Sequence, residues 1–239
     1  MTLPLAKVFV LTIMFQVPFS AMALKNFNEA KKFLTHNLEL FDSKTIYCGC
    51  PVNGRIVDVR ACGYKIHKDP RRASRLEWEH VVPAENFGRS FIEWREGGPK
   101  CHKKGKPFRG RKCAATNPEF AQIEGDLYNL FPEIGELNGL RSNYSMAAIP
   151  GEATRFGACA VKLEGRKFEP MDQAKGIVAR TYIHMDRKYP GRGIVSEKNE
   201  ALFAVWNHEY PITPLECERW KAIEKKQKDR HYFADRCPK

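Results

Sequence analysis

Glu79 and His80 are adjacent in the stretch EWEHVVPAENFG, which covers residues 77–88. Ionisable side chains are costly to bury without partners, so a stretch this rich in them is either a solvated strand or a metal or acid/base site. A neutral imidazole, with an ordinary pKa of about 6.5, is suited to taking a proton from water. A carboxylate is a hard oxygen ligand of the kind that Mg²⁺ prefers. The pair therefore indicates metal-assisted hydrolysis, with phosphodiesters as the candidate substrate.

Phosphodiester hydrolysis also needs a cation that holds the phosphate and stabilises charge on the leaving oxygen. Because Mg²⁺ keeps most of its water ligands, one carboxylate and one amide oxygen from the protein are enough. Glu79 is the candidate carboxylate, and Asn129, in EGDLYNLFP, is the candidate amide. Any Glu-His pair with a distant Asn meets these demands. The residues alone therefore leave open a His80 that only forms a structural hydrogen bond.

These side chains have to be brought together by their elements. Residues 75–80 are expected to form a strand, in which Glu79 and His80 point to opposite faces. For both to serve one site the strand must end or bend there, and Val81-Val82-Pro83 makes a bend plausible because Pro cannot donate to a ladder. Asn129 is expected on a helix over 117–132 that opens at Asn117-Pro118 and stops at Pro132.

The remaining pattern predicts an α+β fold. A first helix is expected over 28–40, capped by Asn26 or Asn28, and Pro83 is expected to open a helix or turn. Residues 45–67 are rich in β-branched and aromatic side chains and contain the turn signal Asn53-Gly54, which predicts short strands. Three helices are expected in the last third: 173–188, one after Ser196, and one from the capping-box pattern at Thr213. We expect one domain over residues 24–239.

The N-terminus and the cysteines indicate export. Residues 1–23 have a cation, Lys7, then an apolar run and the ending Ala21-Met22-Ala23, the pattern of a signal peptide. All eight cysteines follow that segment, and their even number predicts up to four disulfides in an oxidising compartment. Cys48-Gly49-Cys50 lacks the partner spacing of a zinc site. We expect a periplasmic or secreted protein with no membrane span.

The formal net charge is +12, which is high for an exported protein. It predicts a polyanionic partner: nucleic acid, anionic lipid or acidic polysaccharide. Seven Lys and Arg residues and no acidic residue lie between Lys100 and Lys112, bracketed for the most part by Cys101 and Cys113. The cluster is interpreted as a phosphate-binding loop, with a solvated loop that aids solubility as the alternative.

Several stretches together resemble the endonuclease I family of periplasmic and secreted bacterial nucleases. The matching stretches span most of the chain in the expected order: RASRLEWEHVVPAENFGR (72–89), IEGDLYNLFPEIGELNGLRSNY (123–144), GIVARTYIHM (176–185) and WNHEYPITPLECER (206–219). The resemblance implies a ββα-metal core with surrounding helices and disulfide-bonded cysteines.

The resemblance also implies roles. His80 would be the general base, and Glu79 and Asn129 would bind Mg²⁺, with Mn²⁺ or Ca²⁺ as possible replacements. The reaction would be endonucleolytic cleavage of DNA, and of RNA as well, with little sequence preference and with 5′-phosphate ends. We expect a monomer.

One departure from the family concerns the cation at the scissile phosphate. Members of the family place an arginine directly after a Gly-Gly pair, where this chain has Gly97-Gly98 followed by Pro99 and Lys100. Lys100 provides a point charge but no bidentate fork, so Lys100 or Arg95 is predicted to take this role. Arg141 is a further candidate for a phosphate contact, and a structural ion pair is the equal alternative.

Two other function classes fit the same residues. A cationic binding protein for nucleic acid or anionic lipid would bind DNA in a salt-sensitive manner and release no product. A metal-dependent phosphatase or phospholipase would hydrolyse monoesters or lipids and leave plasmid DNA intact.

Overall fold

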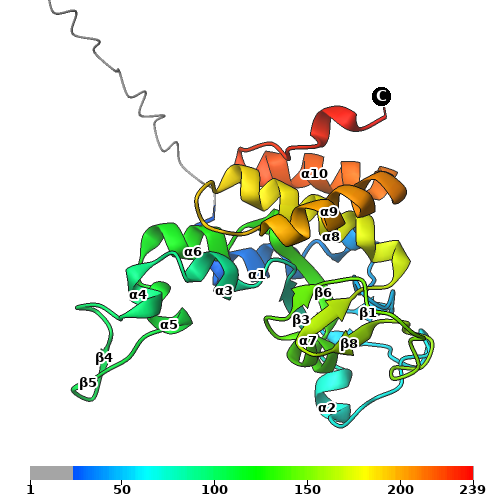
Figure 1. The fold of residues 1–239 in the computed structure, drawn as a ribbon, viewed down its shortest axis with the longest axis horizontal. Coiled ribbons are helices and arrows are strands. Elements are labelled where there is room, and N and C mark those ends of the chain that lie inside the picture. The colour runs from blue at the N-terminus through cyan, green and yellow to red at the C-terminus, as the bar shows by residue number, and fades with distance from the viewer. Residues whose placement is uncertain (1–23, 239) are drawn as a thin grey trace, which may run out of the picture.

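The structure is a computed structural model that describes residues 24–238, so the predicted signal peptide 1–23 lies outside the described residues. One cluster of buried apolar side chains extends from Leu24 to Phe233. In Figure 1 the C-terminal helices are stacked above a small central layer of strands, and a hairpin projects from the body at one end. The α+β class is confirmed. The prediction of a single domain stays a prediction.

The centre of the molecule is a strand–strand–helix unit. Strand β3 (Leu76–His80) pairs antiparallel with β6 (Leu130–Ile134), and α7 (Gly135–Arg141) follows β6 directly. The register sets Glu79 opposite Phe131 and His80 opposite Leu130. This unit places the end of β3 beside helix α7, although more than 50 residues separate them in the sequence.

The prediction of a helix over 117–132 is wrong for the second half of that range. Helix α6 (Pro118–Glu124) is capped by Asn117 as predicted, but it ends at Gly125, and a 3₁₀ turn η2 (Leu127–Asn129) leads into β6. Gly125 lies against the backbone of Asn26, where an added Cβ would be 2.7 Å from the carbonyl carbon. Pro132 sits inside β6, and its carbonyl accepts a hydrogen bond from the Ile46 amide at 2.9 Å. It does not stop a helix.

The N-terminal half contains its predicted elements, but the first helix is shorter than the predicted 28–40 and ends at Thr35. Helix α1 (Phe27–Thr35) is capped by Asn26, and β1 (Val52–Asn53) and β2 (Ile56–Val57) pair around the Asn53-Gly54 turn. Pro83 precedes α3 (Ala84–Gly88) as expected. The other short elements of this half are η1 (Leu38–Phe41), α2 (Pro70–Ala73), α4 (Ile92–Arg95), β4 (His102–Lys103), β5 (Lys106–Pro107) and α5 (Arg111–Ala114).

The C-terminal third forms a helical layer that supports the central unit. Its predicted helices are α8 (Asp172–Lys188), α9 (Glu197–Glu209) and α10 (Pro214–Gln227), the last with the Thr213 capping box. From α10, buried Arg219 donates a hydrogen bond to the Leu127 carbonyl at 2.6 Å, just before β6. A short sheet of β7 (Ser145–Met146), β8 (Lys162–Glu164) and β9 (Lys167–Glu169), and a final turn η3 (Ala234–Arg236), complete the fold.

All eight cysteines are paired, as the disulfide prediction required. The pairs are Cys48–Cys159, Cys50–Cys62, Cys101–Cys113 and Cys217–Cys237. No helix within residues 24–238 is both long and apolar enough to cross a membrane.

The disulfides differ in the length of chain that they close, which gives a stability prediction. Cys48 and Cys159 are 111 residues apart, whereas Cys101 and Cys113 are 12 apart. The unfolded chain loses more entropy when a longer loop is closed, by about 4.7 kcal/mol for a loop of this order and about 3 kcal/mol for a short one. Urea unfolding should therefore show a larger loss of stability for Cys48→Ser with Cys159→Ser than for Cys101→Ser with Cys113→Ser. An equal or larger loss from the short loop would contradict this order.

Candidate active site

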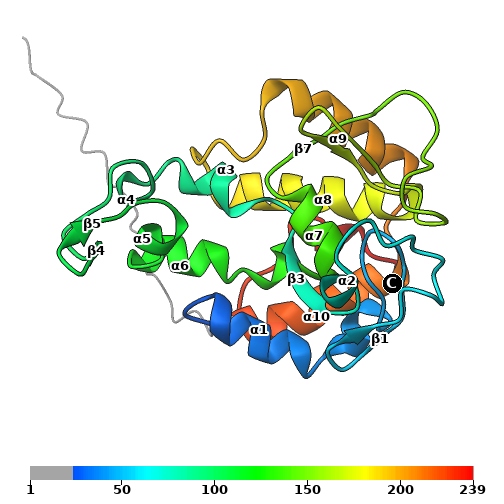
Figure 2. The ribbon, with the colours of Figure 1, turned by 90° about the horizontal axis from the view of Figure 1, so that it is seen from below.

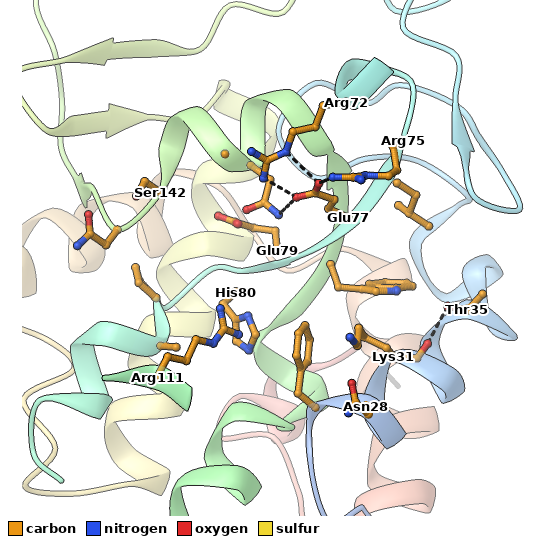
Figure 3. A pocket seen from close by; sticks show the side chains of 18 of the residues that line it. Asn28, Lys31, Thr35, Arg72, Arg75, Glu77, Glu79, His80, Arg111 and Ser142 are labelled. Carbon is orange, nitrogen blue, oxygen red and sulfur yellow. Dashed lines mark hydrogen bonds and ion pairs between the residues drawn. The ribbon is translucent and has the colours of Figure 1, made fainter. Parts of the chain in front are cut away.

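A cleft of about 960 Å³ opens beside the end of β3, between α1, α5 and α7. Figure 3 shows Glu79, His80 and Arg111 on its walls, below the Arg72, Arg75 and Glu77 group. Cations outnumber carboxylates on its lining, which suits a polyanionic substrate. The cations are Lys31, Lys32, Arg55, Arg72, Arg75 and Arg111, and the carboxylates are Glu77, Glu79 and Glu85.

His80 is held in one orientation at the end of β3. Its Nε2 lies 2.8 Å from the backbone oxygen of Glu124, which can only accept, so Nε2 carries the proton. The Nδ1 atom is then unprotonated. The ring is buried against Phe27, with 4.6 Å between ring centroids. Burial, together with the nearby Arg111 charge, lowers the pKa of His80 to about 3. His80 is therefore neutral at pH 7, with Nδ1 as the nitrogen that can accept a proton. A pKa this low makes the ring a weaker base than a free imidazole, so its geometry and not its pKa supports a general-base role.

Glu79 is buried on β3 and is bound from one side. The Tyr47 hydroxyl donates to its Oε1 at 2.8 Å, and the Arg141 guanidinium approaches the same oxygen at 3.0 Å. Within residues 24–238 both of these partners use Oε1, so Oε2 is available for a ligand. Burial raises the pKa of Glu79 above its ordinary value, against the opposing charge of Arg141.

Arg141 is part of the scaffold behind Glu79 and does not line the cleft. Its side chain is fully buried and donates to the backbone oxygens of His80, at 2.9 Å, and Val81, at 2.6 Å. The ion pair predicted as one alternative is present, and the burial of the side chain gives no support to the other alternative, a phosphate contact. The same contacts explain how neighbouring residues serve one site, because Arg141 fixes the backbone where β3 ends.

Asn129 lies outside the cleft, contrary to the sequence-based expectation. The side chain is fully buried, and its amide is engaged on both sides by the backbone of Val82. Its Oδ1 accepts from the Val82 amide at 2.7 Å, and its Nδ2 donates to the Val82 carbonyl at 2.9 Å. Asn129 closes the bend after β3. The geometry gives no support to a metal-ligand role for this residue.

Asn138, on α7, lines the cleft, as do Asn28 and Asn143. Its Nδ2 donates to Glu77 Oε2 at 3.0 Å, and among residues 24–238 its Oδ1 has no hydrogen-bond donor. Although burial opposes it, hydrogen bonds from Arg72 and Arg75 lower the pKa of Glu77 and keep it anionic. Gly139 leaves room for this arrangement, since a Cβ there would lie 2.2 Å from Arg72 Nη1. Oxygens from Glu79 and Asn138 form a donor set that fits Mg²⁺.

Lys100 and Arg95, the predicted phosphate contacts, are exposed and do not line the cleft. Arg95 instead donates to the Arg89 carbonyl at 2.8 Å. The cleft contains Arg111, whose Nε lies 2.5 Å from Glu124 Oε1 and whose side chain remains half exposed. Sequence reasoning placed Arg111 in the basic cluster but gave it no role in catalysis.

One sequence signal could have identified Asn138. If residues 130–134 are taken as a strand that pairs with 76–80, the next helix begins at Gly135 and carries Asn138 on its second turn. The apolar stripe of the preceding helix extends to Leu130, and it concealed that strand.

Comparison with known proteins is consistent with this geometry. The endonuclease I family model matches residues 35–237. An endonuclease-1 of Buchnera aphidicola (subspecies Acyrthosiphon pisum) is 36% identical over 211 residues, covering 86% of this chain and 78% of its own. A periplasmic deoxyribonuclease of Aeromonas hydrophila is 35% identical over 235 residues, covering 95% and 92%. An extracellular deoxyribonuclease of the same species is 36% identical over 199 residues, covering 80% and 82%.

The four disulfides and the periplasmic or extracellular relatives agree with the predicted export of this protein. The family model covers nearly the whole described chain, including the elements that carry Glu79, His80 and Asn138. The chain belongs to the endonuclease I family.

Proposed function

We propose that this protein is an endonuclease that hydrolyses DNA with the help of one divalent cation, and that RNA is a second substrate. The observation that carries the proposal is the juxtaposition of a neutral, oriented His80 with a carboxylate and an amide oxygen in a cationic cleft. The relatives named as deoxyribonucleases support DNA as the substrate. All of the proposed residues come from one chain, so a monomer suffices.

His80 acts as the general base in this proposal. Its Nδ1 takes a proton from the attacking water while the Glu124 carbonyl holds the ring through Nε2. Water attacks phosphorus, the bond to the 3′-oxygen breaks, and the products carry 5′-phosphate ends. The cations that line the cleft contact phosphates and not bases, which accounts for cleavage with little sequence preference.

Glu79 Oε2 and Asn138 Oδ1 hold the cation in this proposal, with water as the remaining ligands. Mg²⁺, or Mn²⁺ in its place, supplies positive charge to the phosphate and to the leaving oxygen. Tyr47 and Arg141 keep Glu79 in place, and Glu77 keeps the amide of Asn138 turned so that its oxygen is available.

Arg111 takes the place of the family arginine that this chain lacks after Gly97-Gly98. It lies beside His80 and provides a planar fork that Lys100 does not. Its ion pair with Glu124 orients the guanidinium before substrate arrives.

The first prediction concerns the base. His80→Ala should lower plasmid nicking by at least about 10²-fold, because general-base catalysis contributes that much or more. Wild type and His80→Ala should be compared with Mg²⁺ and with EDTA, together with His208→Ala, an exposed histidine of α9. Nicking by His80→Ala at the rate of the His208→Ala control would contradict the assignment. Hydrolysis of phosphomonoesters or lipid with plasmid left intact would favour a phosphatase or phospholipase.

The second prediction separates the two asparagines. Asn138→Ala should raise the Mn²⁺ concentration for half-maximal activity at least tenfold with little change in melting temperature, because it removes a cation ligand. Asn129→Ala should instead lower the free energy of unfolding by about 1–3 kcal/mol, because it leaves buried Val82 backbone groups unpaired. The reverse pattern would restore Asn129 as the ligand.

The third prediction separates the three cations. Arg111→Ala should lower kcat for the small diester bis(p-nitrophenyl) phosphate by about 10²-fold, because it removes a charge at the reacting phosphate. Arg95→Ala and Lys100→Ala should remain within about twofold of wild type. A large loss from Lys100→Ala with little loss from Arg111→Ala would return the phosphate contact to Lys100.

A further inference from the structure

The hairpin that projects from the body, residues 102–107, is a second charged feature outside the cleft; we call it the basic hairpin. Strands β4 and β5 form it, and Figures 1 and 2 both show it extending away from the helical layer. Lys104 and Gly105 form its two-residue turn, with φ of +51° and +74°. Two positive φ values match the tight turn that best suits antiparallel strands, so Lys104 is fixed at the tip.

The pairing within the basic hairpin is electrostatically unfavourable. Its register sets Lys103 directly opposite Lys106, and like charges in that position destabilise a strand pair. Lys104 adds a third charge between them. Among residues 24–238 none of these three lysines forms an ion pair, and all three are exposed.

The base of the hairpin is firmly anchored despite this repulsion. The buried Cys101–Cys113 disulfide closes it, and the Phe108 amide donates to the Cys101 carbonyl at 2.8 Å. The Gly110 amide donates to the Trp94 carbonyl of α4 at 3.0 Å. The disulfide and these hydrogen bonds therefore hold the mutually repelling lysines in place. Such an arrangement is stabilised when an external polyanion neutralises them.

The hairpin is continuous with the cleft. A short segment joins it to α5, where Arg111 lines the cleft beside His80. Three residue-to-residue steps lead from Cys101 to Lys104 at the tip, roughly 10 Å at strand rise. A DNA duplex carries one phosphate charge per roughly 1.7 Å of its axis, so a duplex in the cleft offers further phosphates over that distance.

We propose that the basic hairpin binds the phosphate backbone of double-stranded DNA outside the cleavage site, through Lys103, Lys104 and Lys106. This inference rests on the proposed nuclease function. It predicts that the hairpin strengthens binding of long duplexes and takes no part in bond cleavage. A substrate with a single phosphate does not reach it.

The test uses full mature protein with Lys103→Gln, Lys104→Gln and Lys106→Gln combined. A matched control removes the same charge from helices α9 and α10, with Lys198→Gln, Lys221→Gln and Lys225→Gln. Binding of a 30-bp duplex is measured in EDTA at several salt concentrations, and turnover of the duplex and of bis(p-nitrophenyl) phosphate is measured with Mg²⁺.

For the hairpin variant we expect a roughly tenfold higher KM for the duplex at physiological salt and unchanged turnover of the small diester. The slope of log K against log salt should fall by up to about three, because each phosphate contact contributes about 0.9. The melting temperature should not fall, since the repelling pair is relieved. The control should keep the wild-type slope.

Three results would overturn the proposal. An equal loss in the control variant would make it an effect of net charge alone. Slower hydrolysis of the small diester would place the hairpin in support of the cleft. Loss of binding to phosphatidylglycerol vesicles with duplex binding intact would assign it to anionic lipid. If wild type cleaves neither substrate, the proposed nuclease function fails, and the salt slope still decides whether the hairpin binds DNA.

Discussion

The buried guanidinium of Arg141 is the contact on which the candidate site depends. It joins the end of α7 to the end of β3 by binding the carboxylate of Glu79 and the carbonyl oxygens of His80 and Val81. A buried charge is tolerated only when it is paired, and removal of one partner from such a pair costs about 3–5 kcal/mol. The arrangement therefore fixes strand and helix together, and with them the distance between Glu79 and the side chains that α7 presents.

Around the Arg141–Glu79 ion pair, the other ionisable groups of the site are held in different charge states. Burial keeps His80 neutral, two arginines keep Glu77 anionic, and cations from α1, α2 and α5 line the entrance. Each state has a structural cause: burial of the imidazole against Phe27, a pair of guanidinium groups on Glu77, and a disulfide that anchors the segment bearing Arg111. The base, the oxygen ligands and the phosphate contacts thus come from different elements, and the Arg141 contacts bring the first two together.

The sequence was informative wherever a local rule decides the structure. Asn117-Pro118, the Thr213 capping box and Asn53-Gly54 each marked an element that the structure contains, and Glu79 and His80 lie together in the cleft as expected. The sequence pointed to Asn129 and not to Asn138, because the choice between helix and strand at 130–134 depends on the long-range pairing with β3, which local periodicity does not report. The burial of Arg141 and the position of Arg111 in the cleft also depend on tertiary packing, because the local sequence does not distinguish these two arginines from the others.

The most direct test of this account is a crystal structure of the mature protein grown with Mn²⁺, with anomalous diffraction used to place the ion. The account predicts an anomalous peak within coordination distance of Glu79 Oε2 and Asn138 Oδ1, with Asn129 still bound to the backbone of Val82. A peak that is coordinated by Asn129, or that lies away from Glu79, would contradict it.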